Sequence, residues 1–341
     1  MSTTALSAPA QPAQATLVSV IIPVYQGEHL IVGAVQSALR QTHRALEVWV
    51  VDDGSTDRTI ERLASIDDPR LHVLQQSNAG TAAARNNALS HARGQYIAFI
   101  DADDRWFPEK IAMELAVLER APEPIAIAYS CHYAVDDAGR LLRPAPLRRH
   151  AGRAFDLLLD GEDFLMPSLC LFDRRIFDVV GTFAVERFHE DHEFILRASR
   201  QFPIYPTGRR LAVYRQTTSG KCRAILSNYE FARNEELALI NQLASLLSPE
   251  EAERLRRNVI HSLYLRFLMY GFSDHARRML DDVPASKLRG GAKALLGLIF
   301  AKTGLNLLAG ARVAVQTLNR VAGQRWWRRE LARHGLELRY E

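Results

Sequence analysis

The chain has 341 residues, 48% of them hydrophobic, and a formal net charge of +4. This length exceeds that of a typical single domain, so we expect one large domain and a smaller region, with enough apolar residues for a packed core. The three cysteines lie far apart and show no metal-ligand spacing, which excludes a disulfide framework and is typical of thiols in a reducing compartment. Residues 1–16 contain neither a basic leader nor an apolar run, so we expect a flexible tail and not a signal peptide.

Strand-like and helix-like segments alternate in the first third of the chain. The expected strands are 18–25, 46–51, 71–76 and 96–100, and the expected helices are 30–39, 57–66, 81–92 and 108–121. The alternation predicts a parallel sheet with right-handed connections and with helices on both faces. Thr56 or Asp57 is well placed to cap the second helix.

The pattern changes after residue 121. The expected later elements are a strand at 125–135, a turn at 136–139, a surface loop to 153, a helix at 190–201 and a strand at 209–215. A hairpin followed by an irregular loop is a common way to shape an acceptor site on an α/β core. From residue 221 onward the periodicity is helical, so we expect an α/β domain over 17–220 and a helical region over 221–341.

Three acidic clusters lie next to apolar runs, at residues 52–57, 101–104 and 190–191. Loops at the strand ends of an open α/β sheet converge on a ligand-binding crevice. Carboxylates gathered there repel one another unless a cation joins them, and a divalent metal with a phosphate-bearing substrate fits that need. The first cluster is equally compatible with an ordinary strand-to-helix turn. Asp101 and Asp103 indicate metal and pyrophosphate binding more specifically than the first cluster does. They directly follow a buried strand, and burying carboxylates without a cationic partner is costly.

Other motifs narrow the function. Arg85 belongs to a predicted helix and lies either on the surface or in the crevice, where its guanidinium would contact a nucleotide or phosphate. His189 and His192 flank the third acidic cluster, but no further ligand nearby favours a zinc site. The chain lacks both the dinucleotide-binding glycine fingerprint and the phosphate loop that ends in Gly-Lys-Ser/Thr. Dehydrogenase and ATPase functions are therefore disfavoured.

The C-terminal end is basic, with eleven Lys and Arg against three Asp and Glu from residue 286 onward. The apolar segment 294–315 contains Lys302, which makes a membrane span unfavourable. Two interpretations stay open for this end of the chain. It packs on the main domain with a solvated basic face, or it forms interfacial helices with Trp326 and Trp327 at the level of anionic lipid headgroups. No nucleic acid partner is expected.

Five segments in order resemble the inverting glycosyltransferases of family 2, which have the GT-A fold. They are VSVIIPVYQ, VVDDGSTD, NAGTAAARNNAL, YIAFIDADD and HEDHEF, within residues 18–215. The resemblance implies a Rossmann-like nucleotide-diphospho-sugar transferase domain. It also implies a hexosyltransferase-like enzyme that moves a single sugar from a nucleotide donor to an acceptor hydroxyl with inversion, and we expect a UDP-linked donor. The acceptor would be a glycan or a lipid-linked precursor in cell-surface polysaccharide or glycolipid synthesis. The enzyme would be cytoplasmic, or would lie peripherally on the cytoplasmic face of the membrane.

The resemblance also assigns roles to single residues. It implies that Asp191 is the general base. The nucleotide-sugar would be bound by Pro23, Tyr25, Asp53, Arg85 and Asp101. Asp103 would hold the divalent metal, Mn²⁺ or Mg²⁺, with Asp101 as a second candidate ligand, and secondary roles would fall to Glu190, Asn78 and Arg215. Many members have a histidine after the last strand that approaches the metal, and Thr217 stands there in this chain. The strictness of the metal requirement is therefore open.

Two other functions compete with this one. A nucleotidyltransferase that makes sugar nucleotides normally carries a glycine-rich, arginine-containing loop after the first strand, and this chain has none. A non-catalytic, membrane-associated scaffold would account for the basic C-terminal end. Such a scaffold would have no use for the acidic clusters.

Overall fold

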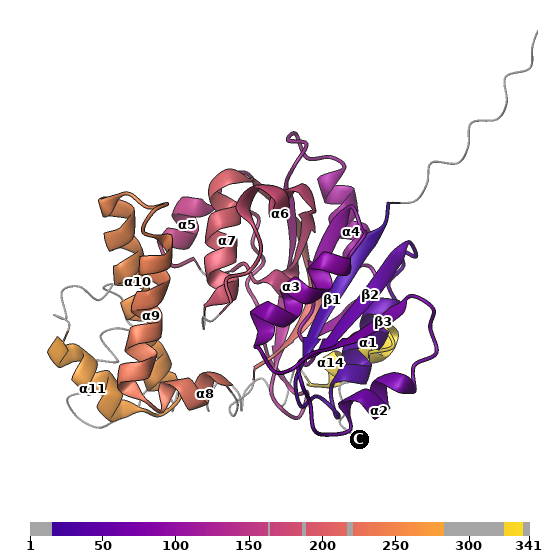
Figure 1. The fold of residues 1–341 in the computed structure, drawn as a ribbon, viewed down its shortest axis with the longest axis horizontal. Helices are drawn as coiled ribbons and strands as arrows, with labels where there is room; N and C mark the ends of the chain where they lie inside the picture. The colour runs from indigo at the N-terminus through magenta and orange to yellow at the C-terminus, as the bar shows by residue number, and fades with distance from the viewer. Residues whose placement is uncertain (1–15, 163, 186–188, 217–220, 283–323, 337–341) are drawn as a thin grey trace, which may run out of the picture.

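A computed structural model describes residues 16–162, 164–185, 189–216, 221–282 and 324–336 (Figure 1). In these residues the strands are β1 (Val18–Val24), β2 (Leu46–Asp52), β3 (Leu71–Gln75), β4 (Tyr96–Phe99), β5 (Arg105–Trp106), β6 (Ile127–Val135), β7 (Leu141–Pro144), β8 (Cys170–Asp173) and β9 (Ile204–Arg215). The helices of the sheet domain are α1 (Ile31–Leu39), α2 (Thr59–Ala64), α3 (Thr81–His91), α4 (Lys110–Leu118), α5 (Phe155–Leu159), η1 (Pro167–Leu169), α6 (Arg175–Val180) and α7 (Glu190–Gln201). The later helices are α8 (Lys221–Leu226), α9 (Tyr229–Leu243), α10 (Pro249–Met269), α11 (Ser273–Asp282) and α14 (Gln324–Arg333).

The strands of the described chain form one mixed sheet in the order β3-β2-β1-β4-β8-β6-β9-β5, with β7 paired to β6. The four strands β3, β2, β1 and β4 are parallel, as the sequence predicts. Beyond these four strands the sheet is mixed: β8 runs antiparallel to both β4 and β6, β9 runs antiparallel to β5, and β6 and β9 are parallel. β8 and β5 have only four and two residues, too few for their periodicity to identify them.

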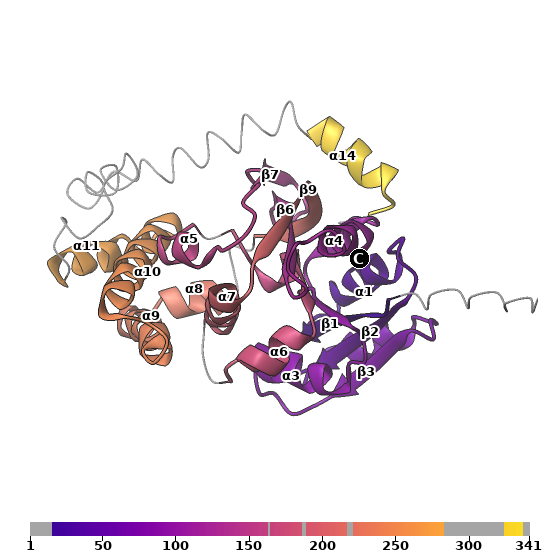
Figure 2. The same ribbon diagram turned by 90° about the horizontal axis from the view of Figure 1, so that it is seen from above.

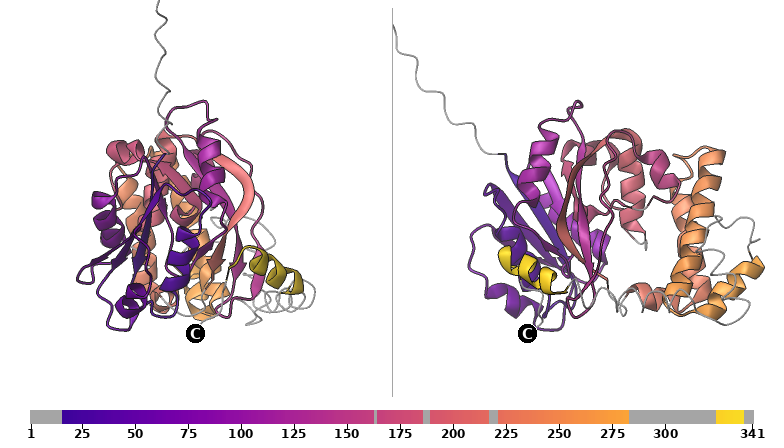
Figure 3. Two further views of the ribbon diagram at one scale, coloured as in Figure 1. Left: turned by 90° about the vertical axis from the view of Figure 1, so that its right-hand side faces the viewer. Right: turned by 180° about the vertical axis from the view of Figure 1, so that it is seen from behind.

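Helices cover both faces of the sheet, which the α/β alternation predicts (Figure 3). Alternate residues of β1 point to opposite faces, so Val20 and Ile22 pack in one hydrophobic cluster with α1 and α4, whereas Ile21 packs in the other with α3. Helix α2 begins at Thr59, later than expected. The N-cap residue is Arg58, whose side chain makes no capping hydrogen bond, so the prediction of Thr56 or Asp57 as the cap is wrong; Asp57, one residue earlier, accepts the backbone N–H of Thr59 at 3.0 Å.

Helices α9 and α10 stand beside α7 and α5, and α8 and α11 lie at one end of α9 and α10 (Figure 1). α10 starts with a capping box, in which Ser248 and Glu251 exchange side-chain and backbone hydrogen bonds. Leu239 of α9 and Val259 of α10 belong to the same hydrophobic cluster as Phe194 of α7. The helical region expected after residue 221 is therefore present, and its core is continuous with that of the sheet domain.

Helix α14 lies against the sheet domain on the side of β6, β7 and β9 (Figure 2). Trp327 is only 1% exposed, packs in a cluster with Phe107 and Val213, and donates its indole N–H to the carbonyl of Gly139 at 3.3 Å. Of the two interpretations of the C-terminal end, packing on the domain therefore holds for residues 324–336, and Trp327 is not available to a membrane surface. The segment 294–315 lies outside the described residues. Among the helices that the structure describes, none is long and apolar enough to cross a membrane.

Candidate active site

Parallel strands bring several of the predicted site residues to one edge of the sheet. Tyr25, Asp53 and Asp101 each follow directly on, or within two residues of, the carboxyl ends of β1, β2 and β4, and these strands are neighbours. Pro23 is buried within β1, whereas the Tyr25 side chain is 54% exposed. An exposed aromatic ring at a strand end is a suitable platform on which a nucleotide base can stack.

Asp53 is buried and organises the loop that leads into α3. Its Oδ1 accepts hydrogen bonds from the Gln76 side chain and the backbone N–H of Ala79, and its Oδ2 accepts the N–H of Gly80, all at 2.8 Å. The side chain of Asn78 donates to the Asp53 carbonyl at 3.0 Å. Asp53 and Asn78 thus shape the floor of the crevice as well as being candidates for binding the nucleoside.

The loop after β1 is fastened to the turn after β2 by a residue that the sequence did not single out. Gln26 has a left-handed backbone with φ of 53°, its side-chain N–H donates to the Thr56 hydroxyl, and its side-chain oxygen accepts the N–H groups of Thr56 and Asp57. A non-glycine residue in this conformation needs such support. Gln26 therefore fixes the position of the adjacent Tyr25. The sequence feature that could have identified Gln26 is its position at the end of the VSVIIPVYQ motif.

Arg85 connects two acidic clusters that are far apart in the sequence. It is 4% exposed, its Nη2 donates to Oδ1 of Asp101 at 2.8 Å, and its Nη1 lies 3.7 Å from Oε1 of Glu190. The guanidinium also lies over the ring of Phe183, 5.2 Å from its centroid. Of the two placements left open by the sequence, the surface is excluded, because Arg85 is buried beside the acidic residues Asp101 and Glu190.

Asp103, Asp104 and Arg215 form a second set of contacts, next to Asp101 in the chain. Asp104 is buried and accepts the backbone N–H of Arg215 at 3.0 Å, and Nε of Arg215 lies 3.4 Å from the carbonyl of Asp103. The Arg215 guanidinium also donates to the carbonyls of Asp136 and Asp137 in the turn between β6 and β7. Arg215 therefore ties the D-x-D segment, residues 101–103 with Asp101 and Asp103, to that hairpin.

The carboxylates of this loop have the properties of a cation site. Burial and the neighbouring charge of Asp101 raise the pKa of Asp103 to about 6. A divalent ion would relieve that repulsion, and carboxylate oxygens are the ligands such ions prefer. Within the residues that the structure describes, no group of three His, Cys, Asp or Glu converges on one point. Asp101 and Asp103 are the residues of this loop that would hold such an ion.

The predicted base lies at the beginning of α7, whose bounds match the expected helix. Asp191 is partly exposed, and its Oδ1 accepts the backbone N–H of His192 at 2.7 Å. Glu190 beside it is buried against Arg85. The expectation that His189 and His192 do not form a zinc site stays a prediction. Thr217, where many members have a histidine, lies outside the described residues.

Comparisons with known proteins agree with this architecture. The family model described as Glycosyl transferase family 2 matches residues 19–181. An uncharacterized glycosyltransferase of Rickettsia felis is 34% identical over 168 residues, which cover 48% of this chain and 27% of that protein. The Escherichia coli enzyme UDP-Glc:alpha-D-GlcNAc-diphosphoundecaprenol beta-1,3-glucosyltransferase WfgD is 41% identical over 103 residues, 30% of this chain and 41% of the enzyme. The chain thus spans less than half the length of both relatives.

Solved structures share the fold. The structure of S. aureus TarS 1–349 in complex with UDP-GlcNAc has a TM-score of 0.57 at 21% identity and covers 89% of this chain and 91% of that one. The mannosyltransferase PcManGT of Pyrobaculum calidifontis, in complex with GDP-Man and Mn²⁺, has a TM-score of 0.53 at 18% identity and covers 91% and 88%. The prediction of the GT-A fold is confirmed, and the prediction of the family is confirmed for residues 19–181, which carry a domain of glycosyl transferase family 2.

Proposed function

We propose that this protein transfers a single sugar from a UDP-sugar to an acceptor hydroxyl with inversion at the anomeric carbon. The observation that carries the proposal is the position of Arg85, which joins Asp101 of the D-x-D segment to Glu190 beside the predicted base. A donor site and a base on one crevice are what a direct displacement requires, because the acceptor must approach opposite the leaving group.

The geometry supports a division of labour among the side chains. Tyr25 and Asp53 receive the nucleoside, and Arg85 orients Asp101 next to the donor diphosphate. Asp191 takes the proton of the acceptor hydroxyl, whose oxygen bonds to the anomeric carbon as the bond to the nucleoside diphosphate breaks. The transition state resembles the oxocarbenium ion of glycoside hydrolysis. Asp103 and Asp101 would hold Mn²⁺ or Mg²⁺, which, when bound, neutralises charge on the departing diphosphate.

The relatives support a lipid-linked or surface-polymer acceptor. WfgD is named as acting on a diphosphoundecaprenol-linked sugar, and a Bacillus subtilis relative, TuaG, is named as a putative teichuronic acid biosynthesis glycosyltransferase. We assign the present protein to the same kind of pathway, at the cytoplasmic face of the membrane. Anionic lipid would be met by exposed arginines of α14 such as Arg329 and Arg333. Co-sedimentation of the double variant Arg329→Glu/Arg333→Glu with anionic vesicles tests this contact, and binding equal to that of the parent refutes it.

Calorimetric titration with UDP and with GDP, each with and without Mn²⁺, tests the donor site. We expect metal-dependent UDP binding that is lost in Asp103→Ala. Absence of UDP binding in every condition would contradict the proposed donor. Release of UDP, and not of pyrophosphate, from a UDP-sugar separates transfer from nucleotidyl transfer.

The base is tested by the isosteric change Asp191→Asn. A positioned base contributes about 10²- to 10⁴-fold, so we expect that loss in the rate of transfer while UDP affinity stays within about twofold. A rate within tenfold of the parent would remove Asp191 from this role.

A further inference from the structure

The start of α7 is held from two sides by buried charges. On the donor side, Arg85 lies beside Glu190. On the opposite side, Nε2 of His189 lies 3.1 Å from Oε2 of Glu236, a residue of α9. The other carboxylate oxygen of Glu236 accepts a hydrogen bond from the guanidinium of Arg266 on α10. A chain of three side chains therefore links two helices of the C-terminal region to the first residues of the base-bearing helix.

Burial limits the partners that are available to the three side chains Arg266, Glu236 and His189. Glu236 is 4% exposed, so its carboxylate depends on Arg266 and His189 for partners that water would otherwise supply. Burial and the charge of Arg266 lower the pKa of His189 to about 4, which leaves the imidazole neutral near pH 7. The neutral ring lies with Nε2 3.1 Å from Glu236, so this carboxylate is the polar group that the imidazole meets on the side of α9.

His189 sets the first turn of α7. Its backbone carbonyl accepts the N–H of Glu193 at 2.8 Å, the first backbone bond of the helix. Asp191 lies within that turn, and its carboxylate accepts the N–H of His192. Movement of His189 would therefore displace Asp191. A displacement of about 1 Å at a reacting group can cost as much as 10²-fold in rate.

We propose that Glu236 is a positioning residue for Asp191, acting through His189, with Arg266 as its counter-charge. The inference rests on the proposed function. It gives the C-terminal helices a part in catalysis that similarity to the family does not assign, since Glu236 lies outside the matched residues 19–181.

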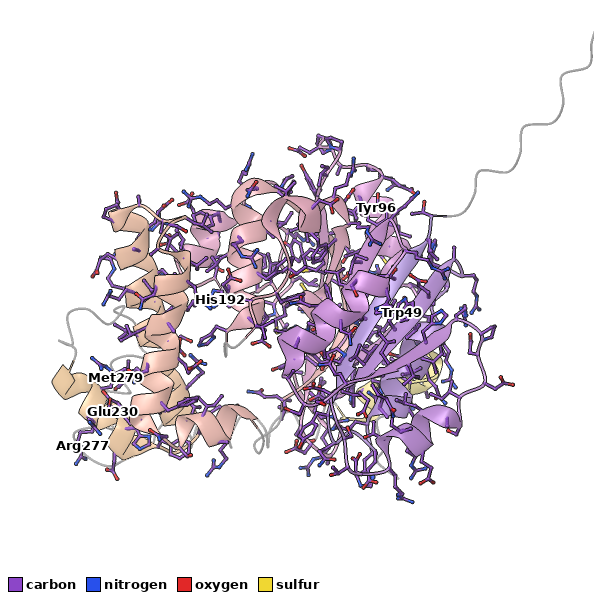
Figure 4. The ribbon with its side chains drawn as sticks, in the orientation of Figure 1. Trp49, Tyr96, His192, Glu230, Arg277 and Met279 are labelled. Carbon is purple, nitrogen blue, oxygen red and sulfur yellow. The ribbon has the colours of Figure 1, made fainter. Side chains whose placement is uncertain are left out.

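The test compares Glu236→Ala and Glu236→Gln with a control on the same helix. Glu230 pairs with Arg278, and both side chains are more than half exposed, so Glu230→Ala removes an ion pair of α9 without touching α7. Figure 4 shows Glu230 well apart from His192 at the start of α7. The readouts are kcat and KM for UDP release from UDP-glucose, UDP-galactose and UDP-N-acetylglucosamine with water as acceptor, calorimetric UDP affinity with Mn²⁺, and the thermal midpoint.

We expect Glu236→Ala to lower kcat about tenfold to a hundredfold while KM and UDP affinity stay within about twofold. Glu236→Gln keeps the size of the side chain and one acceptor oxygen for Arg266, and its NH2 group can donate to His189 in the tautomer with the proton on Nδ1. It should therefore recover part of that rate, and Glu230→Ala should match the parent. Equal kcat in Glu236→Ala and Glu230→Ala overturns the proposal. So does a parallel loss of kcat, UDP affinity and thermal midpoint, which would indicate a general structural role.

Two further variants keep the outcome decisive. If Glu236→Ala does not fold, Glu236→Asp keeps the charge beside Arg266 but withdraws the carboxylate from His189, and a parental kcat there overturns the proposal. Asp191→Asn separates this inference from the function on which it rests. A parental rate in Asp191→Asn refutes the base itself, whereas its loss together with a parental Glu236→Ala refutes only the positioning.

Discussion

The ion pair between Lys110 and Glu114 offers a quantitative test of how the core supports the D-x-D segment. Both side chains are fully buried, with Nζ of Lys110 2.7 Å from Oε2 of Glu114. Nζ also lies 4.3 Å from the ring centroid of Trp106, which follows the D-x-D segment, and Ser130 donates its hydroxyl to the other oxygen of Glu114 at 2.6 Å. The variant Lys110→Met removes the cation and retains most of the volume.

The expected loss is large because the carboxylate would be left in the core with one hydroxyl partner. Breaking a buried pair typically costs about 3–5 kcal/mol, whereas replacing both partners by apolar groups is often neutral or stabilising. We therefore expect Lys110→Met to lower the free energy of unfolding by about 3–5 kcal/mol at pH 7. The double variant Lys110→Met/Glu114→Leu should return to within about 1 kcal/mol of the parent.

The loss should also depend on pH. Burial raises the pKa of Glu114 above its ordinary 4.5, and the charge of Lys110 opposes that rise. Without Lys110 the folded state binds the Glu114 proton more tightly than the unfolded state does. The deficit relative to the parent should therefore grow once pH exceeds the folded-state pKa of Glu114 in the parent, by about 1.4 kcal/mol per unit, until the higher folded-state pKa of the variant is passed.

Urea unfolding of the parent and both variants at pH 5 and pH 7 measures these effects. A deficit below about 1 kcal/mol at pH 7 would refute the reasoning, because it lies far under the cost of an uncompensated buried charge. A double variant as unstable as Lys110→Met would refute it as well.

Three further predictions concern the crevice and α14. Asp53→Ala leaves three N–H donors without an acceptor, so we expect a loss of about 1–3 kcal/mol in stability and weaker UDP binding by calorimetry; unchanged UDP affinity would contradict the role of this loop. Gly54 has φ of +80° and a Cβ there would lie 2.9 Å from the backbone N of Asn78, so Gly54→Ala should lower the free energy of unfolding by about 1–3 kcal/mol, and a parental urea midpoint would contradict this. Trp327→Ala should cost about 3–5 kcal/mol in urea unfolding, and a loss under 1 kcal/mol would show that α14 contributes little to the fold.

Local patterns predicted the elements that have a strong period and a long run. The strand before Asp53 and the helix that carries Asp191 were expected at nearly their observed bounds, because a buried apolar run and an amphipathic period are properties of the segment alone. The pairing of β8 and β5 depends on partners far away in the chain, and no local signal reports it.

The same distinction applies to the candidate site. Residues in motifs could be named in advance, whereas the contact of Arg85 with Glu190 needs the packing of α3 against the start of α7. Glu236 and Arg266 lie in helices of ordinary composition, and only the tertiary structure brings them together. The role of the helical region in the site was therefore not predictable from spacing, and the proposed domain boundary at residues 220/221 stays a prediction.

The pairing of β5 with β9 has a consequence for synthesis on the ribosome. Arg105 and Trp106 find their partners in Val213 and Ala212, and the bond from Arg215 to Asp104 spans 111 positions. In a nascent chain that does not yet include β9, the D-x-D segment lacks both the pairing of β5 with β9 and the hydrogen bond from Arg215 to Asp104. We therefore expect that this loop is ordered only late in translation, and that nascent chains ending before β9 do not retain nucleotide.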